Sequence, residues 1–144
     1  MTAVAFHFGM ADRLAYSCRL LRKASRTGAR VVVTGAAPTL DQLDRMLWVF
    51  DPLEFVPHWR GPRAAAMAPR LAATPVVLVD QVPQPPGSFG VLLNLGDEVP
   101  AGFDAFDRVI EVVPAEDDAR AQARQRWRHY AAQGLAIERH EVQA

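Results

Sequence analysis

Three arginines and one tryptophan gather near the C-terminal end of the sequence, in the stretch DDARAQARQRWRHYAAQG at 117–134. Arg120, Arg124 and Arg128 are spaced four residues apart, and Trp127 precedes the last of them. On a helix with about 3.6 residues per turn, these four side chains share one sector of about 100°. Like charges at this spacing repel by about 0.2–0.5 kcal/mol per pair. Guanidinium groups beside an aromatic ring therefore favour a site for an acidic peptide or a phosphate, and the alternative is a solvated face in an arginine-rich chain.

The remaining residues of this stretch indicate which side of the helix packs on the core and where the helix begins. Ala123 and Tyr130 fall on the adjoining sector and are predicted to face the core, which places Trp127 at the boundary between the core side and the arginines. Arg126 points away from the arginine face. The acidic residues at 116–118 begin the helix, where carboxylates suit the positive end of its dipole and can cap it. They come early enough to leave the arginine face unneutralised.

Composition limits the class of protein. The chain has 144 residues, half of them apolar, which suits one core and a single domain over 1–144. Its 16 basic residues balance 16 acidic ones, which argues against a protein that coats nucleic acid and against direct DNA binding. All basic residues except Lys23 are arginine, so the source has a bias in composition. Any anion site must therefore be a local patch.

Signals for export or membrane insertion are missing from the sequence. No apolar run reaches the roughly 18 residues of a transmembrane helix. The opening MTAVAFHFGMADR lacks the basic start and long apolar segment of a signal peptide. Cys18, the one cysteine, cannot form an internal disulfide. We expect a soluble, cytoplasmic protein.

Apolar runs along the chain predict the strands of a sheet. Continuous β-branched runs such as ARVVVTG are typical of strands buried on both faces of a parallel sheet. We expect strands at 4–8, 29–35, 75–80, 89–96 and 108–114, and an ending strand or extended tail at 135–142.

Stretches with helical spacing alternate with these strands. We expect helices at 11–27, stopped by Gly28, and at 38–50, with Thr39 as its N-cap; the arginine-bearing helix is closed by Gly134. The segment 51–75, rich in Pro, Arg and Ala, is predicted to be irregular. Strands alternating with helices predict an α/β protein with an open, largely parallel sheet flanked by helices.

Such a sheet often binds nucleotides, but the necessary motifs are missing. The first strand-to-helix turn, HFGMADR, has one glycine and lacks the G-x-G-x-x-G pattern, and no phosphate-binding G-x-x-x-x-G-K-[ST] occurs. None of the four histidines has metal-ligand spacing, and Cys18 lies on the apolar stripe of its helix as an inert thiol. We expect no cofactor, no metal and no catalytic site.

Two stretches resemble a known family. LDRMLWVFDPLEFVPH at 43–58 is similar to a Leu-Trp followed by Phe-Val-Pro-His in the chi subunit of bacterial DNA polymerase III, an accessory protein of the clamp-loader complex. VVPAEDDARAQARQRWRHYAAQG at 112–134 is similar to the Val-Pro, acidic residues, Ala-Arg-x-Arg-aromatic-basic-x-Tyr and closing Gly of the same family. The order of elements agrees over the whole chain, whereas 60–106 matches in pattern only.

This resemblance implies a non-enzymatic protein with a Rossmann-like sheet and no nucleotide site. It implies an adaptor that binds the acidic C-terminal tail of single-stranded DNA-binding protein and, through the psi subunit on another surface, the clamp loader. By position, the tail site falls on Arg120, Arg124, Trp127 and Arg128, with Val113 lining a pocket for the terminal aromatic of the tail. Arginine stands here where the family often has lysine, and Trp127 stands where tyrosine is common.

The resemblance also assigns the psi-facing surface to aromatics that match Trp48 and Phe55. The residues themselves leave this open, because Trp48 ends an amphipathic helix and both side chains would also suit a core. A small nucleotide- or nucleic-acid-processing α/β enzyme is the alternative function. An enzyme would show convergent polar groups in a cleft at the carboxyl ends of the strands, whereas an adaptor would show a cationic groove and a separate apolar patch.

Overall fold

A seven-stranded parallel sheet forms the centre of the molecule, in a computed structural model that describes residues 2–51 and 53–142. The spatial order of the strands is β3-β4-β2-β5-β6-β1-β7, and every paired neighbour runs parallel. The strands are β1 (Ala3–Phe8), β2 (Val31–Thr34), β3 (His58–Arg63), β4 (Val76–Gln81), β5 (Val91–Asn94), β6 (Arg108–Val112) and β7 (Ile137–Glu141). The α/β class and the parallel sheet predicted from the sequence are confirmed.

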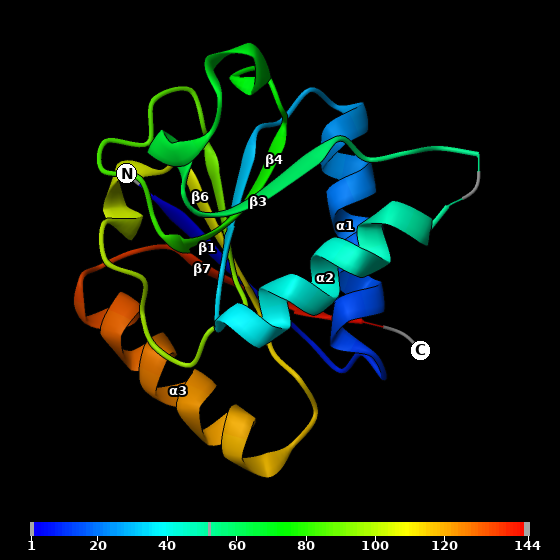
Figure 1. The fold of residues 1–144 in the computed structure, drawn as a ribbon. Coiled ribbons are helices and arrows are strands. Elements are labelled where there is room, and N and C mark those ends of the chain that lie inside the picture. Colours follow the sequence, from blue (N-terminus) through cyan, green and yellow to red (C-terminus); the bar gives the residue numbers. More distant parts are fainter. Residues whose placement is uncertain (1, 52, 143–144) are drawn as a thin grey trace.

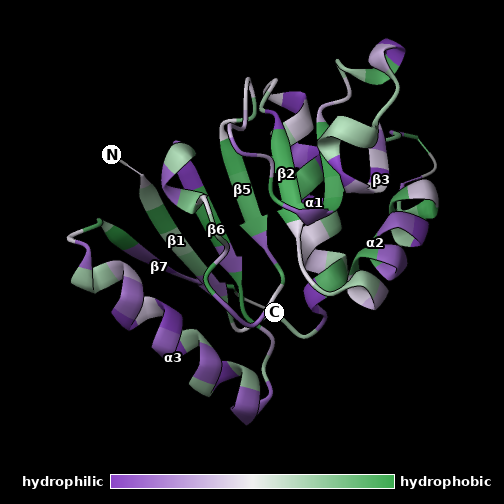
Figure 2. Ribbon diagram, turned by 60° about the vertical axis from the view of Figure 1, so that its left-hand side comes forward, coloured by the Kyte–Doolittle hydropathy of each residue, from purple (hydrophilic) through white to green (hydrophobic). Residues whose placement is uncertain are grey.

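Three α-helices cover the two faces of this sheet unequally: α1 (Arg13–Arg26), α2 (Ala37–Val49) and α3 (Asp117–Ala132). The first two pack on one face, and α3 packs on the other, beside β7 (Figures 1 and 2). Short 3₁₀ turns at Ala64–Ala66, Pro69–Leu71 and Phe103–Ala105 complete the connections. No helix within 2–51 and 53–142 is long and apolar enough to cross a membrane.

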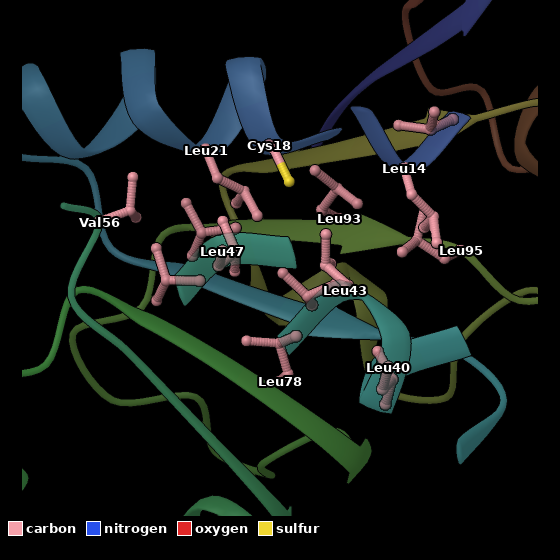
Figure 3. Packing of buried hydrophobic residues seen from close by; sticks show 14 of the residues in the cluster. Leu14, Cys18, Leu21, Leu40, Leu43, Leu47, Val56, Leu78, Leu93 and Leu95 are labelled. Carbon is pink, nitrogen blue, oxygen red and sulfur yellow. The ribbon is translucent and has the colours of Figure 1, made fainter. Parts of the chain in front are cut away.

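Two apolar cores lie on opposite faces because successive side chains of a strand point to opposite sides. Val31 and Val33 of β2 face α1 and α2, whereas Val32 between them faces the side of α3. Figure 3 shows the labelled leucines of α1 and α2 in one cluster with Leu78, Leu93 and Leu95, with Cys18 among them. Burial raises the pKa of the Cys18 thiol to about 11, as expected for an inert buried cysteine.

The segment 51–75 was expected to be irregular, and this expectation is wrong for its middle. Residues His58–Arg63 form β3, which pairs with β4 at one edge of the sheet. The strand escaped prediction because its sequence, HWRGPR, has no apolar alternation and contains Gly61 and Pro62. Proline within a strand is tolerated at a sheet edge, where one side of the backbone needs no partner.

Element ends also differ from the expected ones. Helix α2 begins one residue earlier, with Ala36 rather than Thr39 at the N-cap and a proline in the first turn. The strands expected at 29–35, 89–96 and 108–114 are shorter, and 135–142 contains the regular strand β7. Gly28 and Gly134 adopt positive φ just beyond their helices, as a helix stop requires. Met1, Pro52 and 143–144, which belong to the expected domain and loop, lie outside the described residues.

Candidate functional site

A buried polar cluster holds α3 against the sheet. Glu111 of β6 is fully buried, and its carboxylate accepts hydrogen bonds from Nε of Arg126 at 3.0 Å and from the hydroxyl of Tyr130 at 2.7 Å. The amide of Asn94 on β5 donates to the same carboxylate at 3.0 Å, and Arg126 also donates to the carbonyl of Asp97 at 2.8 Å. Helix α3 is thereby tied to β5, β6 and the loop after β5.

Burial and hydrogen bonding act on the pKa values of the ionisable groups in this cluster. Burial raises the pKa of Glu111, while the charge of Arg126 and the hydrogen bonds from Tyr130 and Asn94 act in the opposite direction. Burial and the neighbouring Glu111 raise the pKa of Tyr130, so its hydroxyl stays a donor. The sequence placed Arg126 away from the arginine face but gave no indication of its burial, because a lone arginine on a helix is usually solvated. An acidic residue inside a buried strand was the signal that could have revealed the pair.

The opposite side of α3 carries the predicted arginine face. Arg120, Arg124 and Arg128 are exposed, and Trp127 is half-buried, with its ring centre 5.0 Å from that of Phe6 on β1. Ala123 and Tyr130 face the core, as predicted. None of the three exposed arginines forms an ion pair with a carboxylate within 2–51 and 53–142.

These side chains border a cavity of about 560 Å³ between α3, the end of β1 and β7. Its wall includes buried Val113, which follows β6, and the rings of Phe6 and Trp127. All five residues expected for the tail site line this one cavity: Val113, Arg120, Arg124, Trp127 and Arg128. An apolar interior with guanidinium groups at the rim suits a ligand that is acidic and apolar at once.

Arg139 of β7 also lines the cavity, and no sequence pattern marks it as a site residue. It lies outside the arginine-bearing helix, in a segment for which the sequence predicts either a strand or an extended tail. Only the pairing of β7 with β1, which sets Arg139 beside Phe6, brings it to the same place.

Trp48 and Phe55 lie far along the sheet from this cavity, at the end of α2 and in the connection to β3. Their side chains are 61% and 49% exposed, so neither is a core residue. Their ring centres are 5.1 Å apart, and both stack near the ring of His58. Val49 and Leu53 are exposed as well. We call these four residues, Trp48, Val49, Leu53 and Phe55, the aromatic patch.

A buried histidine supports the patch from below. The side chain of His58 is fully buried, with Nδ1 2.8 Å from the carbonyl of Val56 and Nε2 3.1 Å from a carboxylate oxygen of Asp44. The two aromatic rings therefore rest on a fixed base instead of a flexible loop.

A larger cleft of about 780 Å³ opens at the carboxyl ends of β2, β4 and β5, where α/β sheets commonly bind ligands. Its ionisable side chains are acidic: Asp80, Asp97 and Glu98. Asp80 already pairs with Arg60, and the side chain of Asn94 is engaged with Glu111. Among the described residues, its lining has no lysine, arginine or histidine. The acidic side chains of this cleft are unfavourable for binding phosphate groups directly.

The parallel sheet with helices on both faces defines the class, a Rossmann-like α/β protein. A solved structure, "Mss116p DEAD-box helicase domain 2 bound to an RNA duplex", has a similar fold, with a TM-score of 0.62 and 9% sequence identity. The match covers 99% of this chain and 64% of that chain. At this identity the likeness shows the fold alone.

Sequence comparison defines the family. The family described as "DNA polymerase III chi subunit, HolC" matches residues 1–138. The DNA polymerase III subunit chi of Pseudomonas aeruginosa is 35% identical over 132 residues, covering 90% of this chain and 87% of that protein. The subunit chi of Haemophilus influenzae is 29% identical over 128 residues, covering 88% and 85%. The chain therefore belongs to the DNA polymerase III chi subunit family, which gives it an accessory role in DNA replication.

Proposed function

We propose that this protein is a non-catalytic adaptor that binds the acidic C-terminal tail of single-stranded DNA-binding protein in the cavity beside α3. The proposal rests on the convergence of four arginines on one apolar cavity, none of which forms an ion pair with a carboxylate in the described part of the chain: Arg120, Arg124, Arg128 and Arg139.

Charge and shape agree with such a ligand. A peptide that ends in an aromatic residue can place its ring against Phe6, Val113 and Trp127, because this part of the wall is apolar. Its terminal carboxylate then lies beside Arg124 and Arg128, where charge-assisted hydrogen bonds contribute about 1.5–3 kcal/mol each. Acidic side chains and a free C-terminus are both recognised by such arginine clusters.

The aromatic patch is the second half of the proposal. We infer that it binds psi or an equivalent clamp-loader component, which would connect the bound tail to the polymerase assembly. Trp48 and Phe55 are exposed with their ring centres 5.1 Å apart, and Val49 and Leu53, close to them in the chain, are exposed as well. This exceeds the scattered apolar exposure found on most surfaces. Aromatic residues on a fixed base are typical anchors of protein interfaces.

Titration calorimetry tests the tail site. The probe is a short acidic peptide ending in phenylalanine with a free carboxylate, and the matched control is the same peptide with an amidated C-terminus. We expect the free acid to bind and the amide to bind at least about tenfold more weakly, the loss of one charged hydrogen bond. Equal binding of the two peptides, or binding of neither, would remove the tail from the proposal.

A further inference from the structure

Arg139 faces the same cavity as the arginines of α3 from a different element. It is an exposed residue in the middle of β7, and its register partner on β1 is Phe6. Residues paired across neighbouring strands point to the same face of a sheet, so Arg139 projects to the face that α3 covers. Its guanidinium carbon lies 5.2 Å from the centre of the Phe8 ring. Arg139 therefore forms a second wall, opposite α3.

The guanidinium of Arg139 has no carboxylate partner within 2–51 and 53–142. Glu138 points to the other face of the sheet, because successive strand residues alternate. Glu141 lies on the same face but pairs in register with Phe8 and forms no ion pair with Arg139. Stacking on Phe8 holds the guanidinium in place and leaves its donors available to a ligand.

The two walls of the cavity face different parts of a bound peptide. The apolar wall of the cavity runs from Trp127 of α3 to Phe6 and Phe8 of β1, and Arg139 lies at the β1 end of this wall. In the proposed tail site, the carboxylate of the terminal residue lies at the other end, beside Arg124 and Arg128. The preceding part of the chain then crosses towards β7, because side chains two positions apart in an extended peptide are separated by about 7 Å.

We propose that Arg139 is a specificity-determining residue that binds an acidic side chain upstream of the terminal residue of the tail. The arginines of α3 alone would accept any chain that ends in an apolar residue with a free carboxylate. Arg139, on the second wall, adds a requirement for acidic residues that precede the C-terminal residue of the ligand. This inference rests on the proposed tail site and assigns the part of the ligand that β7 recognises.

A double-mutant cycle on the full chain tests the assignment. Two peptides are compared, the acidic peptide described above and one in which every upstream acidic residue is replaced by its amide. Arg139→Gln should weaken the acidic peptide about fivefold, the upper range for an exposed ion pair, and leave the neutral peptide unchanged. Arg139→Lys should restore part of the loss, because it keeps the charge without the planar fork.

Arg108→Gln is the matched control, because Arg108 is exposed on β6 but is paired with Ala3 and so faces the other side of the sheet. It should bind both peptides like the wild type. Equal weakening of both peptides in Arg139→Gln would show that the residue only supports the fold, and no weakening would show that β7 takes no part; either result overturns the inference while leaving the tail site intact. Failure of the wild type to bind the acidic peptide would overturn the tail site and this inference together.

Discussion

The cavity beside α3 and the aromatic patch beyond α2 lie near opposite edges of the sheet, since α3 packs beside β7 and α2 beside β3 (Figure 1). The cavity is rimmed by arginines that form no ion pair with a carboxylate among residues 2–51 and 53–142, whereas the patch exposes apolar side chains. A ligand of the cavity must supply negative charge, and a ligand of the patch must supply apolar area. The two surfaces are separate, so the proposed adaptor has room to bind both ligands at once.

Both surfaces nevertheless depend on a buried polar contact beneath them. Arg126 and Glu111 fasten α3, and His58 with Asp44 supports the aromatic rings of the patch. The exposed residues contribute little to the fold, whereas the buried ones position them. Substitutions should therefore fall into two groups, those that abolish one binding activity in a stable protein and those that destabilise the protein itself.

The largest expected effect is the loss of the buried ion pair. Arg126→Ala leaves the carboxylate of Glu111 inside the protein without its charged partner, which costs about 3–5 kcal/mol. Urea unfolding followed by circular dichroism measures this loss. Arg124→Ala, two residues earlier on the exposed face, is the control and should change the free energy of unfolding by less than about 0.5 kcal/mol. Similar stability of the two variants would show that Glu111 does not need Arg126.

Truncation of the aromatic patch should come next in size. Phe55→Ala or Trp48→Ala is expected to weaken binding of the clamp-loader partner by about 2–4 kcal/mol, as for interface anchors, with little loss of stability because both rings are exposed. Phe103→Ala is the control: its ring is 6% exposed, and its removal should cost about 3–5 kcal/mol of stability. Tail binding should be unchanged in Phe55→Ala. A stability loss in Phe55→Ala as large as in Phe103→Ala would place this ring in the core.

Removal of one arginine from the cavity should have a smaller effect. Arg124→Ala and Arg128→Ala are each expected to weaken the acidic peptide by about 1.5–3 kcal/mol, the contribution of a hydrogen bond between charged groups. Binding of the clamp-loader partner should not change. Calorimetry on both variants, with Arg108→Ala as a control on the opposite face, measures the difference. Wild-type affinity in both variants would show that the ligand does not reach the arginines of α3.

The cavity and the patch also differ in how far the sequence revealed them. The arginine face of α3 could be predicted from spacing alone. Arg120, Arg124 and Arg128 are close together in the sequence, and the periodicity of a helix places them on one side. Arg139 and Glu111 depend on strand pairings between distant segments, which no local pattern encodes. The proposed partner role of Trp48 and Phe55 was implied by family resemblance alone, because an aromatic at the end of a helix suits a core as well as an interface.

The fold showed the same limit. Buried parallel strands such as β2 can be predicted from their β-branched runs. The alternation of these runs with helices predicted the α/β class. The edge strand β3 was missed because half of its backbone has no neighbour, so His58–Arg63 carries Arg, Gly and Pro where a central strand would need apolar residues. The order of the strands in the sheet was likewise not predicted from the sequence, because it depends on contacts between distant segments of the folded chain.

The smallest expected effect is a difference in salt dependence between ligand binding at the cavity and partner binding at the aromatic patch. The arginines at the rim of the cavity are exposed, and the screening length falls from about 10 Å at 0.1 M salt to about 3 Å at 1 M. Tail affinity should therefore decline gradually with rising sodium chloride, and less steeply in Arg139→Gln because one charge pair is already lost. Partner binding at the aromatic patch buries apolar area and should be nearly unaffected over the same range. Calorimetry of both interactions at several salt concentrations provides the comparison, and equal salt dependence would mean that the patch also recognises charge.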